Sequence, residues 1–132
     1  MTARSQHFDP PGSATFAIHQ RELGERTTLL SVEGELDLST APRLKWGLID
    51  LLRSVPRTLV LDLSLTTFMD STALGVLVGV RRGMEPGQRL AIVCSGTDIL
   101  KIFEFAGLDE MFSIFPTLEE ALGDARRAAP SG

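Results

Sequence analysis

The chain has 132 residues, close to the commonest size of a single domain, and 43% of them are hydrophobic, so one core can form. Thirteen basic and 17 acidic side chains give a formal net charge of -4, which makes nucleic acid and an anionic membrane surface unfavourable partners. Cys94 is the single cysteine, which excludes an internal disulfide framework and a cysteine-rich metal site.

The apolar runs indicate the cellular location of the protein, and the composition of the chain ends indicates the limits of the domain. A run such as residues 75–80 falls far short of the roughly 20 residues that a membrane span needs. The first thirty residues contain Pro10, Pro11 and scattered charges instead of the apolar stretch of a signal peptide. We therefore expect a cytoplasmic protein without a membrane segment. Residues 1–12 are expected to form a flexible arm, residues 13–128 one domain, and residues 129–132 a flexible tail.

The first half of the chain predicts a hairpin and then a helix. Alternation of Ala14, Phe16 and Ile18 with less apolar residues predicts a short strand, and the residues 27–33 predict its antiparallel partner. After Gly34 the apolar residues recur every three or four positions, which is typical of an amphipathic helix. The helix would carry Leu44, Leu48, Leu51, Leu52 and Val55, with Ser39 or Thr40 as its cap and Pro42 in its first turn.

The second half alternates strands with helices. Local patterns predict strands over residues 58–63, 89–94 and 112–115, and helices over about 71–82 and from about 118 to 125. Residues 95–98 supply a turn and cap for a further helix that carries Ile99, Leu100, Ile102 and Phe103 and stops at Gly107. Thr117 and Glu120 form a capping box for the last helix. Alternating strands and helices require crossover connections. The sequence therefore predicts one α/β domain with a mixed, mostly parallel sheet, an antiparallel first strand and about four helices.

Three loops lead from strands into helices and are expected to share one edge of the sheet. They are residues 35–40, 64–71 and 95–98, and all are rich in hydroxyls and carboxylates. In open α/β sheets, functional groups gather beyond the carboxyl ends of the strands. These loops are therefore the predicted functional region.

Asp70 and Ser71 stand where the second helix begins. The simplest interpretation is a cap, in which either side chain accepts hydrogen bonds from the free N–H groups of the first turn. The alternative interpretation is that Ser71 is modified, because a phosphate there would meet free backbone amides and the positive end of the helix dipole. The two interpretations are compatible.

The run Asp70-Ser71-Thr72-Ala73-Leu74-Gly75-Val76-Leu77 resembles the STAS family, and more narrowly the bacterial anti-sigma factor antagonists. The preceding Thr58-Leu59-Val60-Leu61-Asp62-Leu63 and Val32-Glu33-Gly34-Glu35-Leu36-Asp37 also match, and the resemblance covers roughly residues 14–128. Ala73 departs from the pattern, because many members have glycine there; alanine favours the helix.

The resemblance implies a protein-binding switch. In that family the serine after the aspartate is phosphorylated by a partner serine kinase that is also the anti-sigma factor, which makes Ser71 the expected site and Thr72 the second choice. A serine phosphatase would reverse the modification, and no cofactor or metal is implied. The expected partner-binding residues are Asp37, Leu38, Ser39, Thr40, Phe68, Met69, Asp70, Ser71, Thr72, Ser95 and Thr97. Phe68 and Met69 could instead belong to the core.

Other functions have less support. A STAS scaffold or a small-ligand sensor that is never phosphorylated is the main alternative. A serine hydrolase would need a base near Ser71, but the two histidines are His7 and His19, and the Gly-x-Ser-x-Gly turn is missing. Glu33, Glu35 and Asp37 lack the opposing carboxylate of a glycosidase, so an enzyme is not expected.

Two further residue types are assigned structural roles. Gly75 and Gly79 resemble a membrane dimer motif, but the apolar stretch around them is too short, so we expect close packing of this helix on the sheet. Cys94 follows a buried strand and is expected to be an inert small hydrophobic residue.

Overall fold

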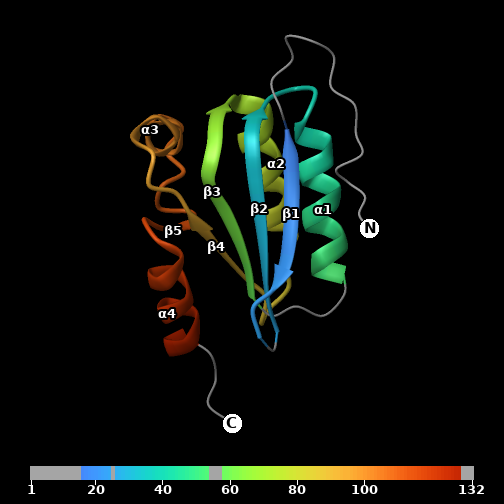
Figure 1. Cartoon of the computed structure of the whole chain (residues 1–132), viewed down its shortest axis with the longest axis vertical. Coiled ribbons are helices and arrows are strands. Elements are labelled where there is room, and N and C mark those ends of the chain that lie inside the picture. Colours follow the sequence, from blue (N-terminus) through green and yellow to red (C-terminus); the bar gives the residue numbers. More distant parts are fainter. Residues whose placement is uncertain (1–15, 25, 54–57, 129–132) are drawn as a thin grey trace.

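The computed structural model describes residues 16–24, 26–53 and 58–128, and these form a five-stranded sheet with four helices (Figure 1). The strands lie in the order β1-β2-β3-β4-β5, with β1 antiparallel to β2 and the remaining pairs parallel. This confirms the predicted fold class. The predicted arm and tail lie outside the described residues. The elements are β1 (Ala17–Glu22), β2 (Thr27–Leu36), α1 (Ala41–Arg53), β3 (Thr58–Met69), α2 (Ser71–Arg82), β4 (Arg89–Val93), α3 (Thr97–Phe105), β5 (Ser113–Phe115) and α4 (Leu118–Ala128).

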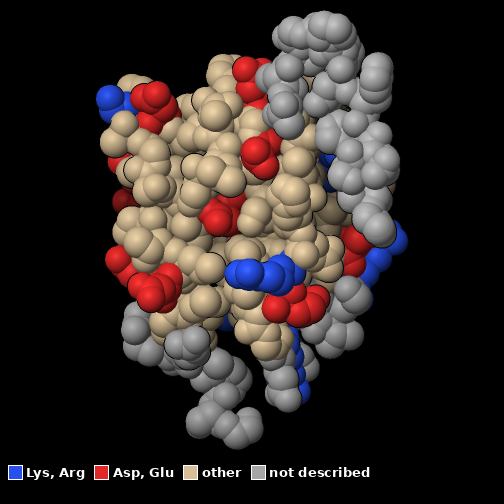
Figure 2. All heavy atoms as spheres, viewed as in Figure 1, with Lys and Arg blue, Asp and Glu red and all other residues tan. Residues whose placement is uncertain are grey.

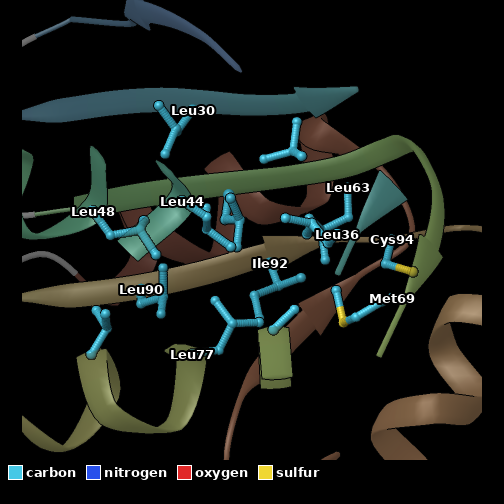
Figure 3. Packing of buried hydrophobic residues seen from close by; sticks show 14 of the residues in the cluster. Leu30, Leu36, Leu44, Leu48, Leu63, Met69, Leu77, Leu90, Ile92 and Cys94 are labelled. Carbon is cyan, nitrogen blue, oxygen red and sulfur yellow. The ribbon is translucent and has the colours of Figure 1, made fainter. Parts of the chain in front are cut away.

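The sheet is covered on both faces because successive strand residues point to opposite sides. Leu59 and Leu61 of β3 join the larger apolar cluster with α1, α2 and α3, whereas Val60 joins a smaller cluster with α4. Figure 3 shows Leu48 of α1 and Leu77 of α2 among the side chains that fill the larger cluster. A central strand buried on both faces explains the nearly continuous apolar run in the sequence.

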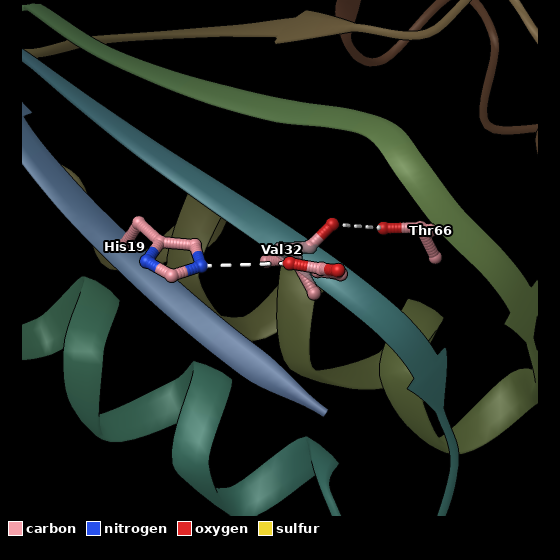
Figure 4. Close-up of polar contacts among 4 residues, drawn as sticks. His19, Val32 and Thr66 are labelled. Atoms are coloured by element: carbon pink, nitrogen blue, oxygen red, sulfur yellow. Dashed lines mark hydrogen bonds and ion pairs between the residues drawn. The ribbon is translucent and has the colours of Figure 1, made fainter. Parts of the chain in front are cut away.

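The strand β3 is longer than predicted, since it continues beyond residue 63 to Met69. Its register against β2 shifts twice, between Ser31 and Glu33 and between Gly34 and Glu35. At the first shift the buried Thr66 hydroxyl donates a 2.9 Å hydrogen bond to the Val32 carbonyl (Figure 4). A side chain thus supplies a donor where the regular ladder is interrupted. After these shifts, β3 ends at the edge of the sheet where α2 begins.

The second strand is also longer than predicted, because β2 runs through Gly34 to Leu36. Gly34 has a φ of 103°, a conformation that glycine adopts at no steric cost. This allows the strand to continue through the second register shift instead of ending there. Thr40, which we expected to cap α1, instead donates its hydroxyl to the Glu35 carbonyl at 2.7 Å.

The helices begin and end close to the predicted positions, but the glycines of α2 are not where we expected them. Gly75 and Gly79 are exposed, and a Cβ added to either would meet no atom within 4 Å. The prediction that they allow close packing of α2 on the sheet is therefore wrong. The buried side of α2 consists of Ala73, Leu74, Leu77 and Val80 instead.

The sheet face that α1 and α2 do not cover carries a few exposed charges. His19 Nε2 of β1 lies 3.5 Å from Glu33 Oε1 of β2, and both side chains are exposed (Figure 4). In the face that Figure 2 shows, the described Lys and Arg residues do not gather into a broad patch, and Asp and Glu are scattered among uncharged residues. This distribution offers no extended cationic surface to a nucleic acid on that face.

Candidate functional site

The site lies where β2 and β3 end side by side. Leu36 and Met69 are paired in the register of these strands, so Asp37 and Asp70 follow at the same edge of the sheet. The Asp70 N–H donates to the Leu36 carbonyl at 3.1 Å, which joins the first loop to the start of α2. Two of the three predicted loops are therefore brought together as expected.

Asp70 is the N-cap of α2. Its backbone is extended, and its Oδ1 accepts hydrogen bonds from the N–H groups of Thr72 at 2.9 Å and Ala73 at 3.2 Å. A carboxylate at this position also interacts favourably with the helix dipole. The structure thus assigns the cap to Asp70 and not to Ser71.

Ser71 is the first residue of α2, and its side chain is exposed. Thr72, the second choice for modification, is partly buried. We expected a phosphate on Ser71 to meet free amides of the first turn, but those of Thr72 and Ala73 are already bound by Asp70. A phosphate on Ser71 would therefore project toward solvent, although the helix dipole would still favour its charge.

The carboxylate of Asp37 organises the loop between β2 and α1. Its Oδ1 accepts hydrogen bonds from the Ser39 hydroxyl at 2.7 Å, the Ser39 N–H at 2.9 Å and the Thr40 N–H at 3.1 Å. The Ser39 hydroxyl contributes most to holding the pKa of Asp37 below its ordinary range; desolvation opposes this effect, and the two backbone bonds add to it. The loop therefore carries an ionised carboxylate at neutral pH.

Exposed apolar side chains flank these loops. Leu38 is 74% exposed in the first loop, and Phe68 is 47% exposed just before the Asp70 cap. Met69 is 2% exposed and packs in the core, so its predicted role in partner contact is wrong. Leu65 on β3 is 61% exposed; it lies within the predicted loop 64–71 but is not among the expected partner-binding residues.

The third predicted loop follows β4. Ser95 and Thr97 are exposed, and Gly96 between them is the N-cap of α3 without a side-chain cap bond. Within the described part of the chain, no hydrogen bond or ion pair joins this loop to Asp37 or Asp70. Cys94 is buried, and burial raises the pKa of its thiol, which makes the sulfur a poor nucleophile at neutral pH.

The described residues give little support to a catalytic base near Ser71, a metal site or a membrane span. His19 lies beside Glu33 on the sheet, and His7 is outside the described residues. Across residues 16–24, 26–53 and 58–128, no three His, Cys, Asp or Glu side chains are grouped as metal ligands would be. None of the described helices is both long enough and apolar enough to span a bilayer.

This combination of a mixed five-stranded sheet, a capped α2 and a serine at its first turn is that of a STAS domain, and the STAS family model matches residues 20–121. The chain therefore belongs to the STAS family. It is similar to the anti-sigma-F factor antagonist RsfB of Mycobacterium tuberculosis, with 32% identity over 98 residues that cover 74% of this chain and 80% of the relative. It is also similar to the anti-sigma-B factor antagonist of Listeria monocytogenes, with 33% identity over 97 residues that cover 70% and 85% of the two chains.

Solved structures show the same likeness. An anti-sigma factor antagonist from Mycobacterium paratuberculosis superposes with a TM-score of 0.77 and 29% identity, covering 90% of this chain and 99% of the other. SpoIIAA of Bacillus in its phosphorylated form shares the fold, with a TM-score of 0.65, 23% identity, and coverage of 83% and 100%.

Proposed function

We propose that this chain is an anti-sigma factor antagonist that is controlled by phosphorylation of Ser71. The unphosphorylated form binds an anti-sigma factor that is also a serine kinase, and this binding releases a sigma factor. The observation that carries the proposal is the exposed Ser71 at the first turn of α2, in a chain similar to curated anti-sigma factor antagonists.

The accessible hydroxyl supports the chemical step. The Ser71 Oγ would attack the γ-phosphorus of ATP held by the kinase; the new P–O bond replaces the bond to ADP, and the hydroxyl proton passes to a base of the kinase. Because the Asp70 bonds to Thr72 and Ala73 already fix the first turn, the kinase meets a serine on a preformed helix end.

The surroundings of Ser71 support partner binding. Leu38 and Phe68 are apolar side chains that a partner can cover, and the ionised Asp37 provides a charged group beside them. We include Ser39, Thr40, Ser95 and Thr97 in the same proposed surface, since the first two follow β2 and the last two follow β4, the strands on either side of β3.

Phosphorylation would switch binding off by charge. It adds about -1.5 to -2 charges beside the Asp70 carboxylate, in the middle of the proposed surface. Each 1.4 kcal/mol of repulsion or desolvation weakens binding about tenfold, so the switch needs no refolding. SpoIIAA of Bacillus, which shares the fold, has been solved in a phosphorylated form. A serine phosphatase would restore the binding form.

Mass spectrometry with the kinase of the source organism tests the proposal. After incubation with ATP we expect phosphate on Ser71 in the wild type and in Thr72→Ala, and none in Ser71→Ala. In a binding titration, Ser71→Ala should bind the kinase even with ATP present, and Ser71→Asp should bind at least tenfold more weakly. Phosphate on another residue, or equal binding of Ser71→Asp and wild type, would contradict the proposal.

A further inference from the structure

A groove of about 870 Å³ lies between α1 and α2. Ile49 and Leu52 of α1 and Val76 of α2 give it apolar walls, and one end is formed by Thr72. Since Thr72 is the neighbour of Ser71, the groove begins at the site described above. Its volume is within the range that is typical of ligand pockets in proteins.

On the α2 side of the groove, two glycines leave gaps between the side chains of Thr72, Val76 and Val80. Gly75 and Gly79 line it, both are exposed, and the space around each would accept a Cβ without any contact within 4 Å. Glycine in a helix interior is destabilising relative to alanine, so the fold itself has no packing reason for these two residues. Their effect is to leave the backbone of α2 open to a group from outside the described chain.

The α1 side of the groove is cationic, although the chain as a whole is acidic. Lys45 and Arg53 line it eight residues apart, which is about 12 Å along a helix. Among the lining residues the single carboxylate is Glu85. Next to Lys45, Trp46 is 56% exposed, and the Lys45 ammonium lies 5.5 Å from its ring centroid. The groove therefore suits an occupant with an apolar side and negative charges.

The dimensions favour a helix over a small molecule. The α2 side runs from Thr72 to Gly83, about 16 Å or three helical turns. Two cationic groups about 12 Å apart match acidic residues two turns apart on one helix, whereas a compact anion would reach one of them. An amphipathic helix that lays its apolar face in a groove is a common recognition mode.

We propose that the groove between α1 and α2 binds an amphipathic helix of the anti-sigma factor. Its apolar face packs on Ile49 and Val76, its backbone approaches Gly79, and its acidic residues pair with Lys45 and Arg53. The identity of the partner rests on the proposed function. The groove adds a second contact beside Ser71, and a phosphate there would repel the acidic helix across the shared end.

Binding titrations with the purified anti-sigma factor of the source organism, without ATP, test this proposal. Gly79→Leu places a side chain in the groove at a position where a Cβ meets no atom within 4 Å, and Lys45→Glu reverses the charge of one groove residue. We expect each change to weaken binding at least tenfold. Lys101→Glu on the exposed side of α3 is the matched charge control and should bind within twofold of wild type. Circular dichroism and thermal unfolding would verify that each variant is folded.

A photo-crosslinking residue in place of Glu85, which lines the groove, gives an independent readout. We expect the crosslink to fall on a helix of the anti-sigma factor that carries acidic residues, and a crosslink to a loop would overturn the proposal. If wild type binds and Gly79→Leu and Lys45→Glu bind equally well, the groove proposal is wrong while the proposed function stands. If wild type binds no anti-sigma factor, both are wrong.

Two other occupants of the groove, a small amphipathic anion and a second copy of this chain, would give different experimental results. Laurate, as a small amphipathic anion, should give no saturable heat of binding in isothermal titration calorimetry, and the chain should not form a dimer that Gly79→Leu dissociates. Saturable binding of laurate that Gly79→Leu abolishes, or such a dimer, together with unchanged binding of the anti-sigma factor by the groove variants would overturn the proposal.

Discussion

Replacing Asp70 tests how the fold presents Ser71. Asp70→Ala removes the oxygen that accepts hydrogen bonds from Thr72 at 2.9 Å and Ala73 at 3.2 Å. Loss of an N-cap costs about 0.5–2 kcal/mol. Because the side chain is only partly buried, water can bind the freed N–H groups, and we expect a loss of about 1 kcal/mol. In a domain of this size that lowers Tm by roughly 3–6 °C.

Two matched variants separate the contribution of the cap hydrogen bonds from that of the charge and from that of the neighbouring Ser71 side chain. Asp70→Asn keeps an acceptor oxygen and loses the charge, so its cost should be the dipole interaction alone, about 0.3–1 kcal/mol. Ser71→Ala changes an exposed side chain that is not the cap, and its effect should stay within about 0.5 kcal/mol. Urea unfolding followed by far-UV circular dichroism measures all three free energies of unfolding.

The order of the three free energies of unfolding tests whether Asp70 is the cap of α2. The cap assignment predicts that Asp70→Ala is the least stable, followed by Asp70→Asn and then Ser71→Ala. The kinase should also phosphorylate Ser71 more slowly in Asp70→Ala, because the first turn that presents the hydroxyl frays. If Ser71→Ala were the least stable, or if Asp70→Ala unfolded like wild type, the assignment of the cap would be refuted.

Three further predictions follow from the fold. Thr66→Val leaves the buried Val32 carbonyl without its donor and should cost about 1–3 kcal/mol in urea unfolding; a loss below 0.5 kcal/mol would show that the bond contributes nothing. Because the pKa of Asp37 is lowered, its ionised form stabilises the fold above the ordinary aspartate pKa of about 3.9, and this contribution is lost as the pH falls through the lowered value. Wild type should therefore exceed Asp37→Asn in stability at neutral pH, with the difference vanishing in acid, and a difference that grows in acid would contradict this. Gly79→Ala should raise stability by about 0.5–1 kcal/mol, since a methyl group there meets nothing; a loss on thermal unfolding would show a hidden clash.

Local signals in the sequence were sufficient for α2. The Asp70-Ser71 pair, followed by an apolar pattern with the helical period, predicts a helix over residues 71–82, and the structure has it there. The strand–helix alternation likewise predicts the sheet, because parallel neighbours require crossovers. These features depend on residues close together in the chain, which is why one sequence reveals them.

The length of β3 depends on contacts that are distant in the chain. Within its continuation to Met69, the Thr66 hydroxyl bonds to the carbonyl of Val32, which is 34 residues earlier. The inward position of Met69 and the outward position of Leu65 follow from the register shifts against β2. A periodicity count cannot locate such a shift, and a change of register by one residue reverses which side chains face the core.

The division of roles between Asp70 and Ser71 explains how a switch can operate without disturbing the fold. Asp70 supplies the hydrogen bonds that start α2, so the neighbouring hydroxyl is not needed for stability and stays exposed. A phosphate added there would meet a helix end whose dipole favours negative charge, and this offsets part of its repulsion from Asp70. The same phosphate changes the surface that a partner must desolvate. In the switch that we propose, the energetic cost of modification would therefore fall mainly on the complex, because a partner would have to desolvate the phosphate.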